Sequence, residues 1–348
     1  MTDPTTMSCP VPAVETERVL LGHGSGGRLM AELLGDVIAA ELGGDVTSED
    51  AATVDTGTAE VVISTDSFVV TPRVFPGGDI GALAVHGTIN DVAMRGARPV
   101  ALSLAYIVEE GLPLDELRAV TASAARAADA AGVRIVTGDT KVVQRGAADG
   151  LYVTTTGLGV RPPDAQPSAA GGRPGDAVLL SGPIALHGTA ILSARESLGF
   201  EAEIASDSRP LHALVAAMIE AAGREVHTLR DPTRGGLAST LNELAEASSV
   251  GVEIDEDSVP VPPPVAAACE LLGLDPLHVA NEGCLVAFVA PTSAGAVLDA
   301  MRARAEGAQA RRIGEVTAGH PGRVLMRTLL GATRVVDMLV GEQLPRIC

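Results

Sequence analysis

Residues 60–107 read EVVISTDSFVVTPRVFPGGDIGALAVHGTINDVAMRGARPVALSLAYI, and this stretch decides the fold class. Its first part, 60–70, is rich in Val and Ile, which is typical of a strand that runs into a turn. Residues 79–96 have a helical pattern, and 100–107 return to a strand pattern. A strand, a helix and a second strand in one run predict mixed α and β structure.

The same mixture continues on both sides of this stretch. Residues 27–42 are expected to form an amphipathic helix, because four apolar residues recur at helical spacing: Leu29, Leu33, Val37 and Ile38. Pro113 opens an Ala-rich helix over 113–131. Two further strands are expected, a short buried one over 133–137 that ends at Gly138-Asp139, and one over 151–160.

A Pro- and Gly-rich segment, RPPDAQPSAAGGRPG at 161–175, is the clearest linker candidate. The elements expected after it are a strand over 177–181, helices near 187–197, 210–222 and 236–247, and strands over 283–290, 323–329 and 334–340. Because helices and strands mix irregularly, two α+β domains are favoured over a doubly wound sheet. The expected domains are 1–165 and 175–340, followed by a flexible tail, 341–348, which carries Cys348.

Composition limits the classes of function. The chain has 348 residues, is 46% hydrophobic and has a formal net charge of −19. An acidic surface repels phosphate backbones and anionic lipids, so neither nucleic acid nor a membrane is expected as a partner. A nucleotide can still bind through Mg²⁺ and local backbone N–H groups.

The sequence also predicts a cytoplasmic location. The first residues have no basic region followed by an apolar run, and no apolar stretch reaches the length of about 18 residues that a membrane helix needs. The four cysteines form no CxxC pair. A zinc site or a disulfide framework is therefore not expected.

Three acidic segments suggest a magnesium site. Asp66 lies in STDSF, Asn90-Asp91 lies in GTINDVA, and Asp139 follows the buried strand in TGDTK. Carboxylates at strand ends, where loops converge, suit Mg²⁺ because it prefers hard oxygen ligands and phosphate oxygens. Each aspartate alone is better explained as a turn or cap residue, and only the three together favour a metal site.

Four other features carry candidate chemistry. Lys141 is the only lysine of the chain, and a lysine can neutralise phosphate or exchange a proton, although chance explains it equally well. Glu282, in Asn-Glu-Gly, is a candidate general base or a solvated turn residue. Two glycine-rich turns before helices can approach phosphate or can be plain helix starts: HGSGG at 23–27, and RDPTRGG at 230–236, which contains Asp231.

Cys348 is the last residue, and Leu344-Pro345-Arg346-Ile347 precede it. A proline stiffens the approach, and the guanidinium of Arg346 is expected to favour a thiolate, against the adjacent terminal carboxylate. Taken alone, the residue is an exposed thiol without a role. Cys284, one step into an apolar strand, is expected to be a small core residue.

These segments together resemble the HypE family of hydrogenase maturation proteins over nearly the whole chain. The matching pieces are HGSGGR at 23–28, STDSFVV at 64–70, GDIGALAVHGTINDVAMRGARP at 78–99, TGDTKVV at 137–143, RDPTRGGLA at 230–238, NEG at 281–283 and the terminal PRIC. The terminal PRIC is the most specific. The Asp and Gly segments are shared with the wider superfamily of aminoimidazole ribonucleotide (AIR) synthetase and selenophosphate synthetase.

The resemblance implies a PurM-like, AIR synthase-related fold whose N-terminal domains dimerise, with ATP and Mg²⁺ bound between the domains. It implies ATP-dependent dehydration of an S-carbamoyl group on Cys348 to a thiocyanate, which supplies cyanide to [NiFe] hydrogenase. The implied partners are the carbamoyltransferase HypF and the HypC–HypD complex. The implied catalytic residues are Cys348, Lys141 and Glu282. The implied nucleotide and metal residues are His23, Gly24, Gly26, Gly27, Asp66, Asn90, Asp91, Asp139, Thr140 and Asp231, with Asp66, Asp91 and Asp139 on the metal.

Three other functions stay open. Selenophosphate synthetases usually place a Cys or selenocysteine and a Lys in the N-terminal glycine segment, and GHGSGGR has neither. An AIR synthetase gives no role to a terminal cysteine. A non-enzymatic carrier would present the thiol to partners and use ATP only as a conformational ligand.

Overall fold

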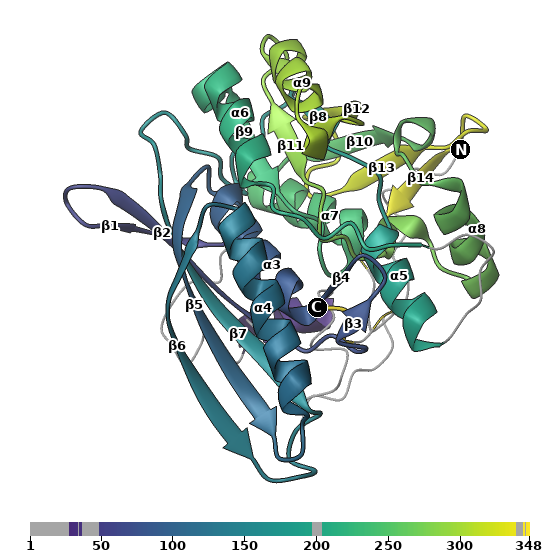
Figure 1. The fold of residues 1–348 in the computed structure, drawn as a ribbon. Coiled ribbons are helices and arrows are strands. Elements are labelled where there is room, and N and C mark those ends of the chain that lie inside the picture. Colours follow the sequence, from purple (N-terminus) through teal and green to yellow (C-terminus); the bar gives the residue numbers. More distant parts are fainter. Residues whose placement is uncertain (1–27, 34, 37–48, 197–203, 339–343, 345) are drawn as a thin grey trace.

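The computed structural model describes residues 28–33, 35–36, 49–196, 204–338, 344 and 346–348. Two β-sheets with their helices lie side by side, and the C-terminus lies between them, close to β3 (Val74–Phe75) and β4 (Gly78–Asp79) (Figure 1). Helices and strands alternate irregularly along the chain, which confirms the predicted α+β class.

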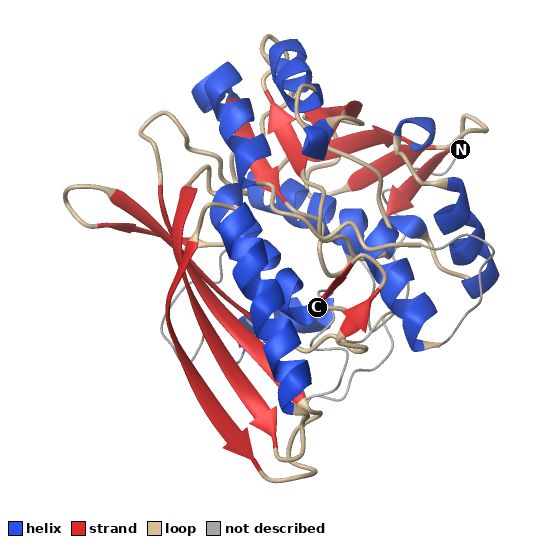
Figure 2. Cartoon of the chain, in the orientation of Figure 1, coloured by secondary structure: helices blue, strands red, loops and turns tan. Residues whose placement is uncertain are grey.

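The first sheet has five strands in the order β1-β2-β7-β5-β6. Their bounds are β1 Ala52–Asp55, β2 Glu60–Phe68, β5 Arg98–Glu109, β6 Arg134–Val143 and β7 Leu151–Val160. Only β5 and β6 are parallel, and the other neighbours are antiparallel. Helices α3 (Ile80–Met94) and α4 (Leu114–Ala130) cover one face of this sheet (Figure 2).

Helix α3 joins the two halves of the molecule. Asp79 caps its start by accepting hydrogen bonds from the backbone N–H groups of Gly81 and Ala82. The helix is apolar on nearly all sides, as is expected of a helix that is buried all round. Its last turn, Ala93 and Met94, belongs to a core cluster of the second half. The two halves therefore share a continuous core through α3.

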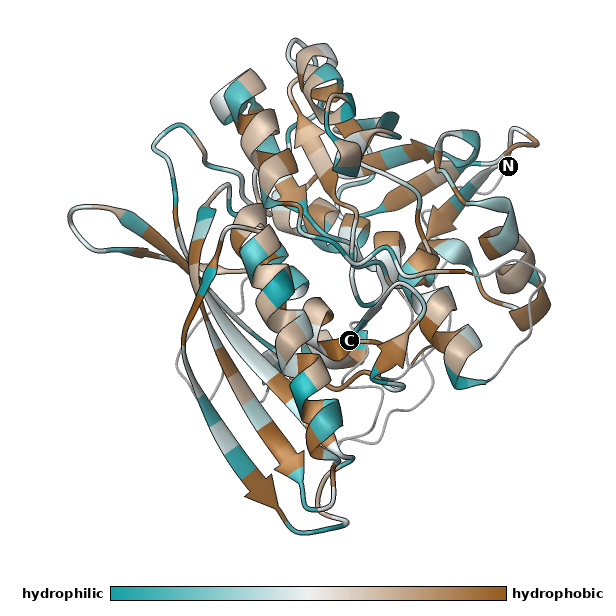
Figure 3. Cartoon of the chain, in the orientation of Figure 1, coloured by the Kyte–Doolittle hydropathy of each residue, from teal (hydrophilic) through white to brown (hydrophobic). Residues whose placement is uncertain are grey.

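The opposite face of the first sheet has no helix among the described residues. Side chains on it include Ile63 of β2 and Leu158 of β7, which pair across the two strands and are exposed. Strand β6 is exposed along nearly its whole length, and Val136 is among its exposed residues on this face. Figure 3 shows hydrophobic residues along β5 and β6. We call this surface the open face.

The second sheet has seven strands in the order β14-β13-β10-β12-β8-β11-β9. Their bounds are β8 Ala177–Leu180, β9 Val226–Arg230, β10 Gly251–Asp255, β11 Val286–Val289, β12 Arg311–Thr317, β13 Val324–Arg327 and β14 Thr333–Val336. The helices of this half are α5 Leu186–Arg195, α6 His212–Ala222, α7 Gly236–Ser248, α8 Pro263–Leu272 and α9 Ala294–Arg302. Strands β8 and β11 are buried on both faces, because side chains of each enter two different core clusters.

Several element boundaries differ from the predictions. The strand predicted to end at Gly138-Asp139 continues to Val143, so Asp139 and Lys141 lie inside β6 and not in a loop after it. Strands β1, β9, β10 and β12 and helices α8 and α9 were not predicted. Of the predicted helix over 27–42, the described part is α1 (Arg28–Glu32) and a few residues after it. No helix in the described ranges is long and apolar enough to cross a membrane.

Candidate active site

A cavity of about 210 Å³ lies between the two halves of the molecule. Strand β2, helix α3, the turn after β9 and the C-terminus all contribute to it. Its lining residues are Glu49, Asp50, Ser64, Thr65, Asp66, Gly87, Asp91, Arg230, Thr233, Arg234, Glu282 and Cys348. Segments that are far apart in the sequence thus place five carboxyl side chains, two guanidinium groups and one thiol around one small space.

Two of the lining acids, Asp50 and Asp91, form the strongest candidate for a metal site together with Asp231, which does not line the cavity. Asp50, Asp91 and Asp231 each offer an oxygen, and these oxygens lie within 4.8 Å of one another. Burial raises the pKa of all three, and neighbouring carboxylates raise the pKa of Asp91 further. For Asp231 the pKa is about 6. A divalent cation suits this arrangement, because it would neutralise charges that otherwise repel one another in a buried place.

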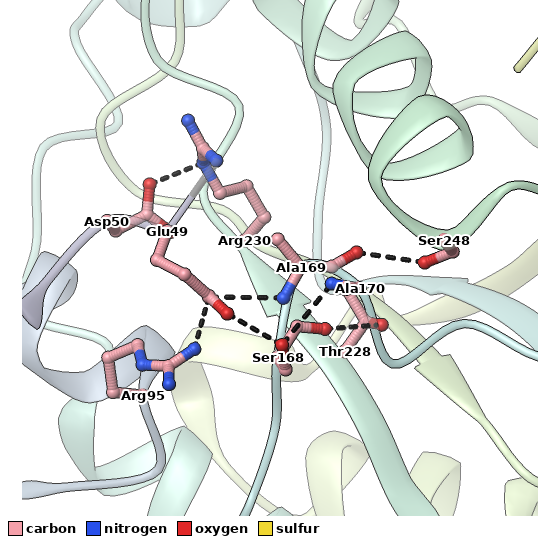
Figure 4. A network of polar contacts seen from close by, with 9 residues as sticks. All are labelled: Glu49, Asp50, Arg95, Ser168, Ala169, Ala170, Thr228, Arg230 and Ser248. Atoms are coloured by element: carbon pink, nitrogen blue, oxygen red, sulfur yellow. Dashed lines mark hydrogen bonds and ion pairs between the residues drawn. The ribbon is translucent and has the colours of Figure 1, made fainter. Parts of the chain in front are cut away.

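Asp50 was not predicted from the sequence. It forms an ion pair with Arg230, which also contacts Glu243 at 3.1 Å. Figure 4 shows the network around it, in which the neighbouring Glu49 forms an ion pair with Arg95 at the end of α3. The Glu49 carboxylate also accepts a hydrogen bond of 2.6 Å from Ser168 Oγ. The segment before β1 is thereby fixed against α3 and against the connection between the two sheets.

Asp66 and Asp91 reach the cavity from two different elements. Asp66 was expected at the end of a strand, where loops converge, and Asp91 within the helix predicted over 79–96. Asp66 instead lies within β2, on the face that the helices cover, and Asp91 lies within α3. Asp91 Oδ2 accepts a hydrogen bond of 2.7 Å from Ser64 Oγ of β2. Strand-to-helix packing therefore brings these two acids together.

Glu282 is 3% exposed and lies at the side of the cavity that the second half provides. Burial raises its pKa well above the ordinary value, and the negative charges of Asp231, Asp66 and Asp207 raise it further. Arg234 acts in the opposite direction. A carboxyl group whose pKa is raised toward neutrality is suited to accept and release a proton at physiological pH.

The backbone around Glu282 is held by Asp207. The Asp207 carboxylate accepts hydrogen bonds from the N–H groups of Glu282 at 3.1 Å and Gly283 at 3.0 Å. Asn90 fixes the loop that contains Asp207: its amide nitrogen donates to Arg209 O at 3.1 Å, and its amide oxygen accepts from Leu211 N at 2.7 Å. Asn90 thus does not line the cavity; its side chain secures the loop that supports Glu282.

Cys348 lines the cavity, and the described residues of the tail are packed against the body. The backbone N–H of Val69 donates to Cys348 O at 2.9 Å, and Ile347 is buried. Burial raises the pKa of the Cys348 thiol to about 12, while the charge of Arg234 opposes that rise. The prediction that Arg346 stabilises the thiolate was wrong, because Arg346 instead contacts Asp149 at 2.7 Å.

The remaining predicted residues do not line the cavity. Asp139 and Lys141 form an exposed ion pair at 2.5 Å on β6, and Thr140 between them is exposed as well. Strand register places Lys141 beside Ile107 of β5, which is exposed, so this lysine lies on the open face. Four glycine-segment residues lie outside the described residues: His23, Gly24, Gly26 and Gly27.

Comparison with known proteins gives the family. Residues 48–161 match the model for "AIR synthase related protein, N-terminal domain", and residues 173–327 match the corresponding C-terminal domain model. A carbamoyl dehydratase HypE of Bradyrhizobium diazoefficiens is 54% identical over 330 residues, which are 94% of this chain and 95% of that protein.

Two solved structures agree with this assignment. One, a HypE–HypF complex, superposes with a TM-score of 0.84 at 44% identity and covers 88% of this chain and 99% of the other. The second, a HypE in complex with ATP, has a TM-score of 0.81 at 48% identity and covers 95% of this chain and 100% of the other. The fold, the sequence and the cavity around a C-terminal cysteine lead to one conclusion: the chain belongs to the HypE family of AIR synthase related proteins.

Proposed function

We propose that this protein uses ATP to dehydrate a carbamoyl group carried on Cys348, and so forms an S-bound cyanide. The observation that carries the proposal is that Cys348 lines the same cavity as Glu282, Asp50 and Asp91, and that Asp231 completes an acid cluster with the last two. Two relatives that are 54% identical to this chain are also carbamoyl dehydratases of the HypE family.

The reaction converts a thiocarbamate, S–C(=O)–NH₂, into a thiocyanate, S–C≡N, with net loss of one water. The carbamoyl oxygen is a poor leaving group, and bound MgATP would supply the phosphoryl group that lets it leave as phosphate. Two N–H bonds must break while the C–O bond breaks and the C≡N triple bond forms. A base in a water-poor space is therefore needed beside the nitrogen.

Glu282 is our candidate for that base. Its ionised carboxylate takes a proton from nitrogen, and its raised pKa lets it hold that proton afterwards. Arg234 orients the sulfur end of the cargo, because it lies close enough for the charge at Cys348 to be the main cause of its raised pKa. Both side chains belong to the second half of the molecule, whereas the acids Asp66 and Asp91 belong to the first.

The acid cluster is our candidate Mg²⁺ site. Asp50, Asp91 and Asp231 would hold the ion, and Asp66 would order its water shell. This assignment revises the predicted metal set, in which Asp66 and Asp139 had the places now given to Asp50 and Asp231. Phosphoryl transfer depends mainly on positioning and charge neutralisation, which three buried carboxylates around a cation provide. The glycine segment 23–27 stays a candidate for contacting the phosphates.

Lys141 and Asp139 lie on the open face, outside the cavity of this subunit, so a role for them in the reaction requires a second subunit. We propose that the open face packs against the open face of another copy, as a homodimer. Exposed apolar side chains such as Ile63, Val136 and Leu158 on a sheet face support this, since removing apolar surface from water favours association. The same contact would bury the Asp139–Lys141 pair and place the lysine in the subunit interface.

The partners follow from the chemistry and the relatives. A carbamoyl donor must load Cys348, and a solved HypE–HypF complex supports a HypF protein in that role. The product cyanide must pass to an iron acceptor, for which we propose the HypC–HypD complex. We therefore propose that the protein acts in the cytoplasm, in the maturation of [NiFe] hydrogenase.

The decisive test is intact mass measurement on protein that a HypF partner has carbamoylated. With ATP and Mg²⁺, the loaded chain should lose the mass of one water, and Glu282→Gln should bind ATP but keep the full mass. A non-enzymatic carrier is the second candidate, because a terminal thiol alone can deliver cargo. ATP turnover with no mass loss, or mass loss that Glu282→Gln leaves unchanged, would exclude the dehydration mechanism.

A further inference from the structure

We propose that His187 is a positioning residue for this reaction: it fixes the C-terminal tail in the cavity and links the docked tail to the loop that supports Glu282. The inference rests on the proposed function, because it assigns a role in presenting the cargo on Cys348. His187 lies in the first turn of α5 and is not among the residues that line the cavity.

The tail docks mainly through its backbone. Arg346 O accepts from Thr71 N at 3.3 Å and from Arg195 Nη2 at 2.8 Å. Cys348 O accepts from Val69 N at 2.9 Å. The carbonyl between them, on Ile347, accepts from a histidine ring, His187 Nε2, at 2.9 Å. Each described carbonyl from 346 to 348 thus has a partner on the body.

Helix α5 is shaped to receive the tail. Arg195, at its last turn, bridges Thr71 O at 3.0 Å and Arg346 O, so the helix contacts the tail at both ends. A Cβ at Gly188 would lie 3.1 Å from Leu344 Cδ1 and 2.7 Å from Val279 Cγ1. A larger residue at position 188 would therefore push on the tail and on the loop that contains Val279.

The two hydrogen bonds of the His187 ring are consistent with one tautomer, in which Nε2 carries the proton. A backbone carbonyl can only accept, so Nε2 must carry the proton in the bond to Ile347 O. Burial lowers the pKa of His187 to about 4, which keeps the ring neutral and makes Nδ1 an acceptor. Nδ1 then accepts from Ser206 Oγ at 2.7 Å, and Ser206 Oγ in turn accepts from Ser208 N at 3.1 Å.

The other end of this chain of contacts reaches Glu282. Ser206 immediately precedes Asp207, whose carboxylate accepts the N–H groups of Glu282 and Gly283. The backbone N–H of Ser206 donates to Pro76 O at 2.8 Å, which fixes the loop to the first half. One histidine ring therefore connects the tail that carries the cargo to the loop that holds the candidate base. This geometry would align the cargo with Glu282 only when the tail is docked.

Two substitutions at His187 test its hydrogen bonds to Ile347 O and to Ser206 Oγ one at a time. In His187→Gln the amide nitrogen reaches the position of Nε2 and can still donate to Ile347 O. In His187→Asn the amide reaches only the position of Nδ1, so the contact with Ser206 can persist while the tail carbonyl loses its donor. Losing a hydrogen bond to a buried carbonyl shifts an equilibrium by about tenfold, which corresponds to about 1.4 kcal/mol.

The experiment measures how fast iodoacetamide labels Cys348 in the full chain, peptide by peptide. Cys284, which is buried in the core, serves as an internal reference for opening of the fold. We expect His187→Asn to label Cys348 about tenfold faster with Cys284 unchanged, and His187→Gln to stay near the wild type. Dehydration of loaded protein should slow in His187→Asn and recover in His187→Gln.

Equal labelling of Cys348 in His187→Asn and wild type would overturn the inference. Equal acceleration at Cys348 and Cys284 would also overturn it, because the effect would then be opening of the fold. Failure of the proposed function is distinguishable: the wild type itself would show no dehydration, while the labelling comparison would still report on tail docking.

Discussion

Replacing Asp207 with asparagine tests how the structure supports its candidate base. The carboxylate accepts two buried N–H groups, those of Glu282 and Gly283. An asparagine offers one carbonyl oxygen and one NH₂ group, so one of the two N–H groups would face another donor. Leaving a buried donor unsatisfied costs about 1–3 kcal/mol. For domains of this size the melting temperature should fall by roughly 3 to 10 °C.

The same substitution should change the pH dependence of turnover. The negative charge of Asp207 is one cause of the raised pKa of Glu282, after burial and the charges of Asp231 and Asp66. Removing that charge lowers the pKa of Glu282, so the carboxylate is ionised at lower pH. The acidic limb of the pH–rate profile should therefore move to lower pH, and the maximum rate should fall because the base is weaker.

The assay combines thermal unfolding with single-turnover dehydration of carbamoylated protein across pH. Asp129→Asn, at an exposed position in the last turn of α4, is the matched control and should change neither quantity. If Asp207→Asn melted like the wild type, or if its acidic limb did not move, the supporting role of Asp207 would be refuted.

Three further predictions concern the metal, the thiol and the subunit contact. The pKa of Asp231 is raised to about 6, so in metal-free protein its contribution to folding stability is fully present below the ordinary aspartate pKa of about 4 and is lost as pH rises through about 6, by about 3 kcal/mol at most. Thermal unfolding scans with a chelator should show this loss of stability. Adding Mg²⁺ at pH 7 should restore it, and no restoration would show that these acids do not bind the ion. Arg234→Gln should slow alkylation of Cys348 at pH 8 to 9, because the arginine opposes the rise of the thiol pKa; an unchanged rate would show that this cation does not act on the thiol. Ile63→Glu on the open face should convert a dimer to a monomer in light scattering, because a buried unpaired charge is strongly unfavourable. The control Leu271→Glu, at an exposed position on α8, should leave the dimer intact. A dimer that survives Ile63→Glu would place the subunit contact elsewhere.

Much of the first half was predictable from its sequence. Strand β7 matches its predicted bounds, and β2, α3, α4 and β5 lie within two residues of theirs. These elements are long, and their patterns are determined by burial on one face or all round. The missed strands are short or carry charges: β12 contains Arg311, Arg312 and Glu315, and only two of its seven residues are buried. Tertiary pairing, and not local composition, makes such a segment a strand.

The site was predictable in part, for a comparable reason. Asp66, Asp91, Glu282 and Cys348 belong to distinctive motifs, and all four line the cavity. Asp50 belongs to no such motif, and its role arises from packing of the segment before β1 against Arg230. Asp207 acts through the backbone of another segment, for which a sequence gives no signal. Strand register, which decides the side of the sheet on which Lys141 lies, also has no local signal.

The most direct test of the central claim is infrared spectroscopy of protein whose Cys348 carries a ¹³C-labelled carbamoyl group. With ATP and Mg²⁺, a C≡N stretching band that shows the isotope shift should appear, and it should be absent from Glu282→Gln and from samples without nucleotide. ATP consumption with only the thiocarbamate carbonyl band remaining would contradict the account.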